Sequence, residues 1–360
     1  MNKLLHIFKQ AWWKIKENTT SAIIFLIVFL ILIVILVGFF IFRKNDATLE
    51  NTKAVEIINT NTIETNETTQ TSKTAIPYTA VIENLVDIRP QSGLQEADVV
   101  YEALVEGGIT RFLAVYKTFE TPIKTIGPIR SARPYFIEWT QEYGGIFAHA
   151  GGSLEALNIL QTNGIIDIDQ IGGDQAYFWR TKESFPPHNL FTSSELLAIA
   201  AQDNKVTPPE NDAFEAWQIK TEEPIRTKNK KEIVLDFSTY NYEVRYIYNP
   251  ETNAYARSNG GKAHLDKNSG EQLQVKNIIV QRAQTNLVDP RSGLLGIQTE
   301  GAGDAFVFLD GKKIEGRWEH SATKQRTYFY DTTGKSIALN PGSVWIEVIP
   351  PDRDVLYTQK

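Results

Sequence analysis

The sequence predicts a membrane-anchored protein with two folded regions, the first an α+β or α/β domain and the second a mainly-β domain. Three observations lead to this prediction. An apolar run without any charge covers residues 22–42, glycine turns separate helix-like from strand-like segments over 77–212, and short alternating strands fill 232–360. Roughly 280 residues follow the polar segment after the apolar run, which is enough for two hydrophobic cores.

The apolar run 22–42 has the length and uniformity of a single transmembrane helix. It would be about 31 Å long at about 1.5 Å per residue, which matches the hydrocarbon core of a bilayer. Lysines are in excess in the preceding segment 1–21, so the N-terminus is predicted to be cytoplasmic and the remainder extracytoplasmic. A buried core helix is the alternative, but nothing nearby in the sequence would cover it on all sides.

The segment 43–76 is rich in Thr, Asn and Glu and lacks a hydrophobic period, so it is predicted to be a flexible tether. The chain has no cysteine, which excludes disulfides, thiolate chemistry and a lipidated cysteine anchor. Its formal net charge of −6 argues against nucleic acid as a partner. The expected partners are therefore the cytoplasmic membrane, through 22–42, and a cell-wall polymer or another envelope protein.

Within 77–212, the pattern predicts strands over 77–84, 97–108 and 109–117, with Gly107 and Gly108 at the turn between the last two. A helix is predicted to follow Ser131, as its N-cap, and a buried strand to follow Gly145. These segments make up the mixed first domain.

A second helix is predicted to begin at Ser153, as its N-cap, and to stop at Gly164. A polar, proline-marked linker over 213–231 is predicted to lead into the second domain. In 232–360, apolar and polar residues alternate in short runs between turns rich in Gly, Asn, Asp and Pro, which is typical of an all-β structure.

The chain resembles the bacterial YerB-like lipoproteins, the family called domain of unknown function 3048. The segments that carry the resemblance are RPQSGLQEADVVYEALVEGGITRF at 89–112, IGPIRSARPYF at 126–136, AHAGGS at 148–153, PPHNLFTS at 186–193, and, in the second domain, GGKAHLDKNSGEQL at 260–273 and RTYFYDTTGKSIALNPGSVWIEV at 326–348. The resemblance implies both domains of that family, whose activity is not established. Members are often lipoproteins, whereas the apolar run here predicts an uncleaved helical anchor.

Arginines among the glycine turns are the first candidates for a ligand site, namely Arg89, Arg111, Arg130 and Arg133. Arg130 and Arg133 flank a predicted helix start, where two guanidinium groups would make a clamp for phosphate or carboxylate. The alternative is that they pair with Asp98, Glu102 or Glu106 and hold the sheet together.

Two further groups of polar residues lie next to loops. His149 precedes Gly151, Gly152 and Ser153, a glycine loop that could cradle an anion, although a hydrogen-bonded core histidine and a helix cap would give the same pattern. His188, with Asn189 beside it, sits in a Pro-Pro loop and could line a pocket or fix the loop.

In the second domain the candidates are His264, Asp266 and Arg326. A histidine and a carboxylate two residues apart on a strand face the same side, which suits an acid–base pair or two ligands of a metal. Asp98 and Glu102 are weak candidates for a hard cation. No organic cofactor is expected, and a divalent cation is the one alternative.

Three functions remain open. The first is an envelope binding protein for an anionic wall polymer or a phosphate-bearing ligand. The second is a metal-dependent phosphotransferase or hydrolase, because the order of the segments is similar to the core of LytR-CpsA-Psr phosphotransferases, although Glu96-Ala97-Asp98 stands where that family has Arg-Ser-Asp. The third is a scaffold that regulates a wall synthase. The residues do not decide whether the protein is an enzyme.

Overall fold

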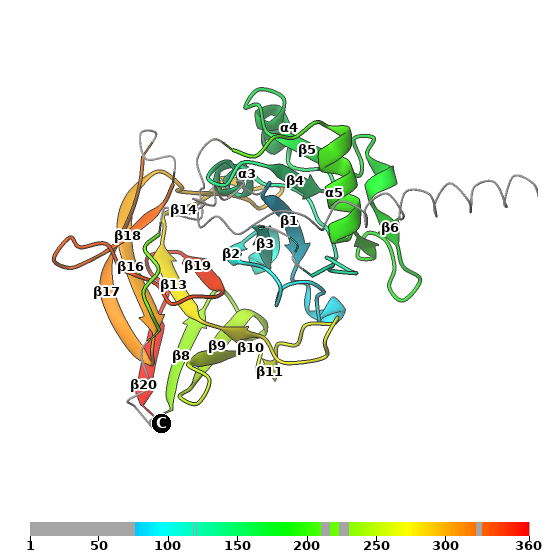
Figure 1. The fold of residues 1–360 in the computed structure, drawn as a ribbon. Helices are drawn as coiled ribbons and strands as arrows, with labels where there is room; N and C mark the ends of the chain where they lie inside the picture. The colour runs from blue at the N-terminus through cyan, green and yellow to red at the C-terminus, as the bar shows by residue number, and fades with distance from the viewer. Residues whose placement is uncertain are drawn as a thin grey trace, which may run out of the picture. The chain divides into compact units, whose positions relative to one another are not determined.

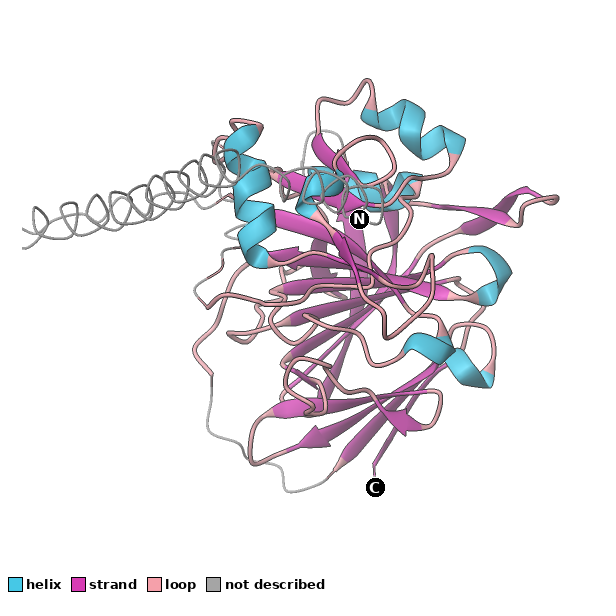
Figure 2. Cartoon of the chain, turned by 90° about the vertical axis from the view of Figure 1, so that its right-hand side faces the viewer, coloured by secondary structure: helices cyan, strands magenta, loops and turns pink. Residues whose placement is uncertain are grey.

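The computed structural model describes residues 76–117, 119, 121–209, 217–222, 230–321 and 326–359. The chain from Ser72 to Lys360 forms one compact unit. The strands of this unit form two main sheets, and α-helices are few among the described residues (Figures 1 and 2).

The larger sheet has ten strands in the order β18-β17-β16-β13-β19-β2-β3-β1-β4-β5. Figure 1 shows that this one sheet contains both early strands, coloured blue and cyan, and late strands, coloured orange and red. Its strands are β1 (Tyr78–Glu83), β2 (Val99–Leu104), β3 (Thr110–Tyr116), β4 (Ile146–His149), β5 (Ile166–Asp169), β13 (Asn277–Arg282), β16 (Gly301–Leu309), β17 (Lys312–His320), β18 (Tyr328–Asp331) and β19 (Val344–Ile349).

The second sheet has six strands, in the order β11-β10-β9-β8-β20 with β12 paired to β10. Two short hairpins complete the β-structure. The strands of the second sheet are β8 (Lys231–Asp236), β9 (Glu243–Asn249), β10 (Ala254–Asn259), β11 (Lys262–Ala263), β12 (Gln274–Val275) and β20 (Val355–Gln359), and those of the hairpins are β6 (Trp179–Arg180), β7 (Leu190–Phe191), β14 (Thr285–Asp289) and β15 (Leu294–Ile297).

The helices lie close to the early strands of the large sheet (Figure 1). The α-helices are α3 (Pro134–Gln141), α4 (Leu154–Leu160) and α5 (Ser194–Asp203), and the 3₁₀ turns are η1 (Val86–Ile88), η2 (Glu106–Gly108), η3 (Gln175–Tyr177) and η5 (Tyr240–Tyr242). Ser153 caps α4 by accepting a hydrogen bond from the Ala156 N–H, as predicted. The predicted cap of α3 is wrong, because Arg133 takes that position and Ser131 Oγ donates to the carbonyl of Ala150.

The hydrophobic core has two parts, one on each face of the large sheet. On one face, α3 and α4 pack through Phe136, Trp139 and Leu160. On the other face lie α5 and the second sheet, whose strand β9 alternates buried and half-buried residues and contributes Tyr246 and Tyr248 to the core. Because β2 and β3 are covered on both faces, all of their residues are buried, and most of them are apolar, with Glu102, Thr110 and Arg111 as the buried polar exceptions.

The predicted fold class is wrong in its balance of helix and strand, and it did not include a sheet that both regions share. Strand β19 pairs in parallel with β2 on one side and with β13 on the other, so the first and last parts of the chain share one sheet. The fold is mostly β-sheet with few helices. Period and turn signals report local structure, and they carry no information on which distant strand a given strand pairs with.

The predicted transmembrane helix over residues 22–42 lies outside the described residues. In the part of the chain that the structure describes, no helix is long and apolar enough to cross a membrane. The single-pass helix is therefore not part of the described fold, and the fold class is corrected on this point as well. The prediction rested on hydropathy and length alone, which do not determine how a chain is attached to a membrane.

Two glycines with the same backbone conformation make a matched pair for testing the junction of β1 and β4. Gly145 has φ +81° and Gly164 has φ +77°. A Cβ on Gly145 would lie 1.9 Å from the carbonyl oxygen of Pro77, whereas a Cβ on Gly164 meets nothing within 4 Å. The Pro77 oxygen also accepts the hydrogen bond from the Ile146 N–H that opens the pairing of these strands.

We expect Gly164→Ala to cost about 1–2 kcal/mol, which is the strain of a left-handed conformation. Gly145→Ala should lose the same stability and about 1–3 kcal/mol more, because the new Cβ overlaps the carbonyl oxygen of Pro77 and the backbone has to move. Urea denaturation of both variants measures the difference. Equal losses would show that the junction tolerates a side chain at Gly145.

Candidate functional site

Several predicted site residues meet at one edge of the large sheet. Strands β1, β4 and β5 are parallel, and β2 points the same way as β1 because both are antiparallel to β3. Their carboxyl ends carry Glu83, His149 and Asp169, and Glu106 follows β2. In sheets with parallel strands, ligands bind beyond the carboxyl ends, so this edge is where a site is expected.

Guanidinium and carboxylate groups form a cluster at this edge, which we call the arginine cluster: Glu83, Glu106, Arg111, Arg130 and Arg133. Arg133 donates two parallel hydrogen bonds to Glu106, at 2.5 and 2.6 Å. The Arg130 Nε lies 3.1 Å from a carboxylate oxygen of Glu83. Arg133 thus pairs with Glu106, one of the partners predicted from the sequence, whereas Arg130 pairs with Glu83, which is not among the predicted partners.

Arg111 lies opposite Glu83 in the pairing of β3 with β1 and is almost fully buried. Among the described residues, its one assigned hydrogen bond runs from Nη1 to the carbonyl of Ser131, at 3.1 Å. Burial, followed by the charges of Arg133 and Arg130, lowers the pKa of Arg111 to about 10. The cluster therefore holds three guanidinium groups against two carboxylates.

The histidine and glycine loop lie beside the same edge. The ring of His149 is buried, with Nδ1 2.8 Å from the carbonyl of Gly151 and Nε2 2.9 Å from Asp167. The Gly151 N–H donates to Asp169 at 2.6 Å, so the loop is bound to its own sheet. Gly152 bridges to Ala132, which joins this loop to the arginine segment. The hydrogen bonds of His149 and Ser153 are those of a core histidine and a helix cap.

His188 extends the arginine cluster, whereas Asn189 does not reach it. The Nδ1 of His188 lies 2.9 Å from both carboxylate oxygens of Glu83. Asn189 donates to the carbonyl of Thr181 at 2.7 Å and accepts from Arg180 at 3.0 Å, so it fixes the loop.

A second polar group lies inside the protein, between the two sheets. Arg257 of β10 is fully buried and forms an ion pair with Glu102 of β2, and its Nε lies 3.7 Å from Glu347 of β19. Its guanidinium carbon lies 4.6 Å from the ring centre of Trp345. Burial and the charge of Glu102 raise the pKa of Glu347, so the protonated form is favoured there.

His264 and Arg89 belong to this interior network rather than to an open site. Arg257 donates to Nδ1 of His264, and Nε2 of His264 lies 2.7 Å from the amide oxygen of Gln91. Since a guanidinium can only donate, Nδ1 must accept and the ring is neutral. Arg89 donates to Asn84 at 2.8 Å, and Gln91 also donates to Asn84 at 3.0 Å.

Asp266 and Arg326 are placed apart from His264. Asp266 is buried and accepts hydrogen bonds from the N–H groups of Leu94 and Gln95, at 2.8 and 3.1 Å, so it ties a loop of the first part of the chain to the second. Arg326 lies 4.0 Å from the ring centres of both Tyr143 and Trp217. Among the described residues, neither side chain forms a hydrogen bond or an ion pair with the ring of His264.

The carboxylates proposed as cation ligands have separate partners. Asp98 accepts a hydrogen bond from the Lys117 N–H at 2.6 Å, while Glu102 pairs with Arg257. Within the described ranges, no group of three or more His, Cys, Asp or Glu side chains is arranged to hold a metal ion.

The sequence interpretation missed a pocket of about 490 Å³ that lies away from the arginine cluster, and it also missed the buried charges of the interior network. The pocket includes Trp179, Phe191 and Lys267. Lys267 is far from the other two in the sequence, so no sequence pattern indicates that the three residues line one pocket. Glu347 did give a signal, since it is a carboxylate within the apolar strand VWIEVI.

Comparison with known proteins gives a consistent result. Residues 64–207 match the N-terminal domain, and residues 233–346 the C-terminal domain, of the family described as protein of unknown function DUF3048. The putative lipoprotein YerB of Bacillus subtilis (strain 168) is 32% identical over 276 residues, which cover 76% of this chain and 81% of that protein. The crystal structure of B. subtilis YerB aligns with a TM-score of 0.70 at 30% identity, covering 82% of this chain and 97% of that one.

These findings correct the predicted localisation. The related protein is named a putative lipoprotein, which is a different kind of membrane attachment from the predicted single-pass helix with a cytoplasmic N-terminus.

The buried His264 makes a pH dependence of stability predictable. Burial, followed by the charge of Arg257, lowers its pKa well below the usual value. The unfolded chain, with a histidine pKa of about 6.5, then binds more protons than the folded one, so stability falls as the pH drops below about 6.5. We expect the free energy of unfolding to decrease more steeply between pH 7.5 and 5 in the parent than in His264→Gln.

Urea denaturation at a series of pH values tests this expectation. His320→Gln controls for the change of residue type, since the ring of His320 lies outside the network and contacts the carbonyl of Thr299. Parallel pH profiles for the parent and His264→Gln would contradict a neutral, buried His264.

Proposed function

The chain belongs to the DUF3048 family, whose activity is unestablished, and we propose that it is an extracytoplasmic binding protein that holds an anionic ligand at the arginine cluster. The extracytoplasmic setting is proposed by analogy with the relative that is named a putative lipoprotein. The ligand would be a phosphate-bearing molecule or an anionic cell-wall polymer.

The observation that carries this proposal is the excess of positive charge around Arg111. Arg133 is neutralised by Glu106 and Arg130 by Glu83, whereas no described carboxylate lies within ion-pair distance of Arg111, and Glu106 acts on it only from farther away. A buried charge without a close counter-charge is costly. An anion bound next to Arg111 would supply the missing counter-charge, and this would make binding more favourable.

The position of the cluster also supports an anion site. Arg130 and Arg133 keep part of their side chains exposed, at 17% and 11%, as does Glu106, at 23%. The cluster can therefore be reached from solvent at the carboxyl edge of the parallel strands. Guanidinium groups bind phosphate and carboxylate through paired hydrogen bonds, which sets the class of ligand.

A binding role fits the cluster better than catalysis. His149 uses both ring nitrogens within its own loop and sheet, at 2.8 and 2.9 Å, and Ser153 caps a helix. The carboxylates Asp98, Glu102 and Glu106 serve three different partners and do not converge. No observation in the described residues favours the phosphotransferase or the scaffold over the binding protein.

The test replaces Arg111 by Met in the full-length protein and follows thermal unfolding with and without inorganic pyrophosphate. A ligand at one hundred times its dissociation constant stabilises the folded state by about 2.7 kcal/mol. We expect this shift in the parent and its loss in Arg111→Met. Without ligand, the variant should be as stable as the parent or more so, because an apolar side chain removes an uncompensated buried charge.

Arg317→Met is the matched control, since Arg317 lies on β17 in an exposed ion pair with Glu319. It should keep the full pyrophosphate shift. The proposal fails if pyrophosphate does not stabilise the parent, or if Arg111→Met keeps the shift.

A further inference from the structure

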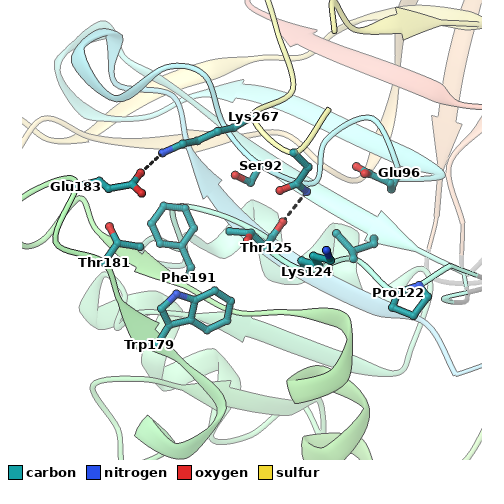
Figure 3. A pocket seen from close by; sticks show the side chains of 12 residues that line it. Ser92, Glu96, Pro122, Lys124, Thr125, Trp179, Thr181, Glu183, Phe191 and Lys267 are labelled. Carbon is teal, nitrogen blue, oxygen red and sulfur yellow. Dashed lines mark hydrogen bonds and ion pairs between the residues drawn. The ribbon is translucent and has the colours of Figure 1, made fainter. Parts of the chain in front are cut away.

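We propose that the pocket beneath the loop around Lys267 is a second ligand site, which binds an uncharged sugar ring. The pocket has a volume of about 490 Å³, within the range of roughly 300–1,000 Å³ that small-molecule sites have. It is lined by residues of four loops and hairpins, namely Ser92, Glu96, Pro122, Ile123, Lys124, Thr125, Trp179, Thr181, Glu183, Phe191, Lys267 and Asn268 (Figure 3).

An aromatic wall is the first feature that selects the ligand. Trp179 of β6 is paired with Phe191 of β7 across the short hairpin, and the two rings are stacked with centres 6.3 Å apart. Phe191 is buried, whereas Trp179 is only half-buried, so the indole ring has surface left in the pocket. Figure 3 shows both rings on the same side of the pocket. A half-exposed indole next to a cavity offers a flat apolar face to the C–H face of a sugar ring.

Polar groups from both parts of the chain line the pocket opposite this wall. Lys267 forms an ion pair with Glu183 at 2.7 Å, and Asn268 donates to the carbonyl of Thr125 at 2.9 Å (Figure 3). Asp266, next to Lys267, fixes the loop by its hydrogen bonds to the N–H groups of the segment 94–95. The backbone of the loop that carries Lys267 and Asn268 is thus held in place before a ligand arrives.

The balance of charge distinguishes this pocket from the arginine cluster. Its lining contains two lysines and two glutamates, Lys124, Lys267, Glu96 and Glu183, so the formal charges cancel. Together with the hydroxyl groups of Ser92 and Thr181, these residues supply both donors and acceptors. A ligand with many hydroxyl groups and no net charge satisfies both kinds of group, whereas an anion would face the two carboxylates.

The carboxylate of Glu96 is a hydrogen-bond acceptor that a sugar hydroxyl group could satisfy. Desolvation, followed by the charge of Asp266, raises the pKa of Glu96. A hydroxyl or amide N–H donor from a ligand would stabilise the ionised form of this carboxylate. The aromatic wall and the carboxylates thus match the two kinds of surface that a sugar presents.

The experiment is calorimetric titration of the full-length protein with two neutral trisaccharides, chitotriose and maltotriose. We expect at least one of them to bind the parent and Trp179→Ala to bind it at least tenfold more weakly. Tyr240→Ala is the matched control, because Tyr240 is an exposed aromatic residue outside the pocket lining, and it should bind like the parent.

Glu183→Gln guards against a folding defect in Trp179→Ala. The Glu183 side chain is 72% exposed, so its replacement should leave the fold intact. It should weaken trisaccharide binding at least threefold, because the charged acceptor and its ion pair with Lys267 are lost. Pyrophosphate should not compete with the trisaccharide, since the two ligands occupy different sites.

Three results would each overturn the proposal. They are no binding of either trisaccharide by the parent, parent-like binding by both Trp179→Ala and Glu183→Gln, and displacement of the trisaccharide by pyrophosphate. The last result would place the sugar at the arginine cluster. It would not touch the anion-binding proposal, which is tested by Arg111→Met.

Discussion

The buried ion pair between Arg257 and Glu102 is the constraint on which the rest of the structure depends. It joins the middle of the large sheet to the second sheet in a place without solvent, with Trp345 against the guanidinium group. Removing one partner of such a pair leaves an uncompensated charge and typically costs about 3–5 kcal/mol. The pair is therefore weak evidence for added stability but strong evidence for a fixed arrangement, because each of its charges has few alternative partners. His264 accepts a hydrogen bond from Arg257, Asn84 donates one to Glu102, and Gln91 in turn lies at hydrogen-bond distance from His264.

The two proposed sites depend on that arrangement in different ways. The arginine cluster lies at the carboxyl edge of strands from the first part of the chain, and its charges are set by Glu83, Glu106 and their neighbours. The pocket needs both parts, because Lys267 and Asn268 come from the loop that Asp266 binds to the N–H groups of 94–95. A shift of the second sheet would thus open the pocket but leave most of the arginine cluster in place. One site is charged and the other is neutral overall, so the same small protein presents two chemically different surfaces.

Local features of the fold could be predicted from the sequence, and long-range ones could not. The hairpin at Gly107 and Gly108 and the cap at Ser153 follow from glycine conformation and side-chain hydrogen bonding, which act within a few residues. The pairing of β19 with β2 joins residues that are more than 200 positions apart, and an apolar strand gives no sign of its partner. The same limit applies to the site. The sequence offered Arg130 as a candidate, but its pairing with Glu83 depends on the loop that returns over the end of β1, which the sequence does not show.

The central position of β19 has a consequence for the biosynthesis of the protein. This strand ends at Ile349, close to the C-terminus, yet it lies between β2 and β13 in the middle of the large sheet. While the chain is being synthesised, this edge of β2 therefore has no partner until more than 200 further residues have been added. Exposed strand edges invite aggregation, and pairings between distant residues form slowly. The large sheet can therefore be completed only after β19 has been synthesised, late in the production of the chain.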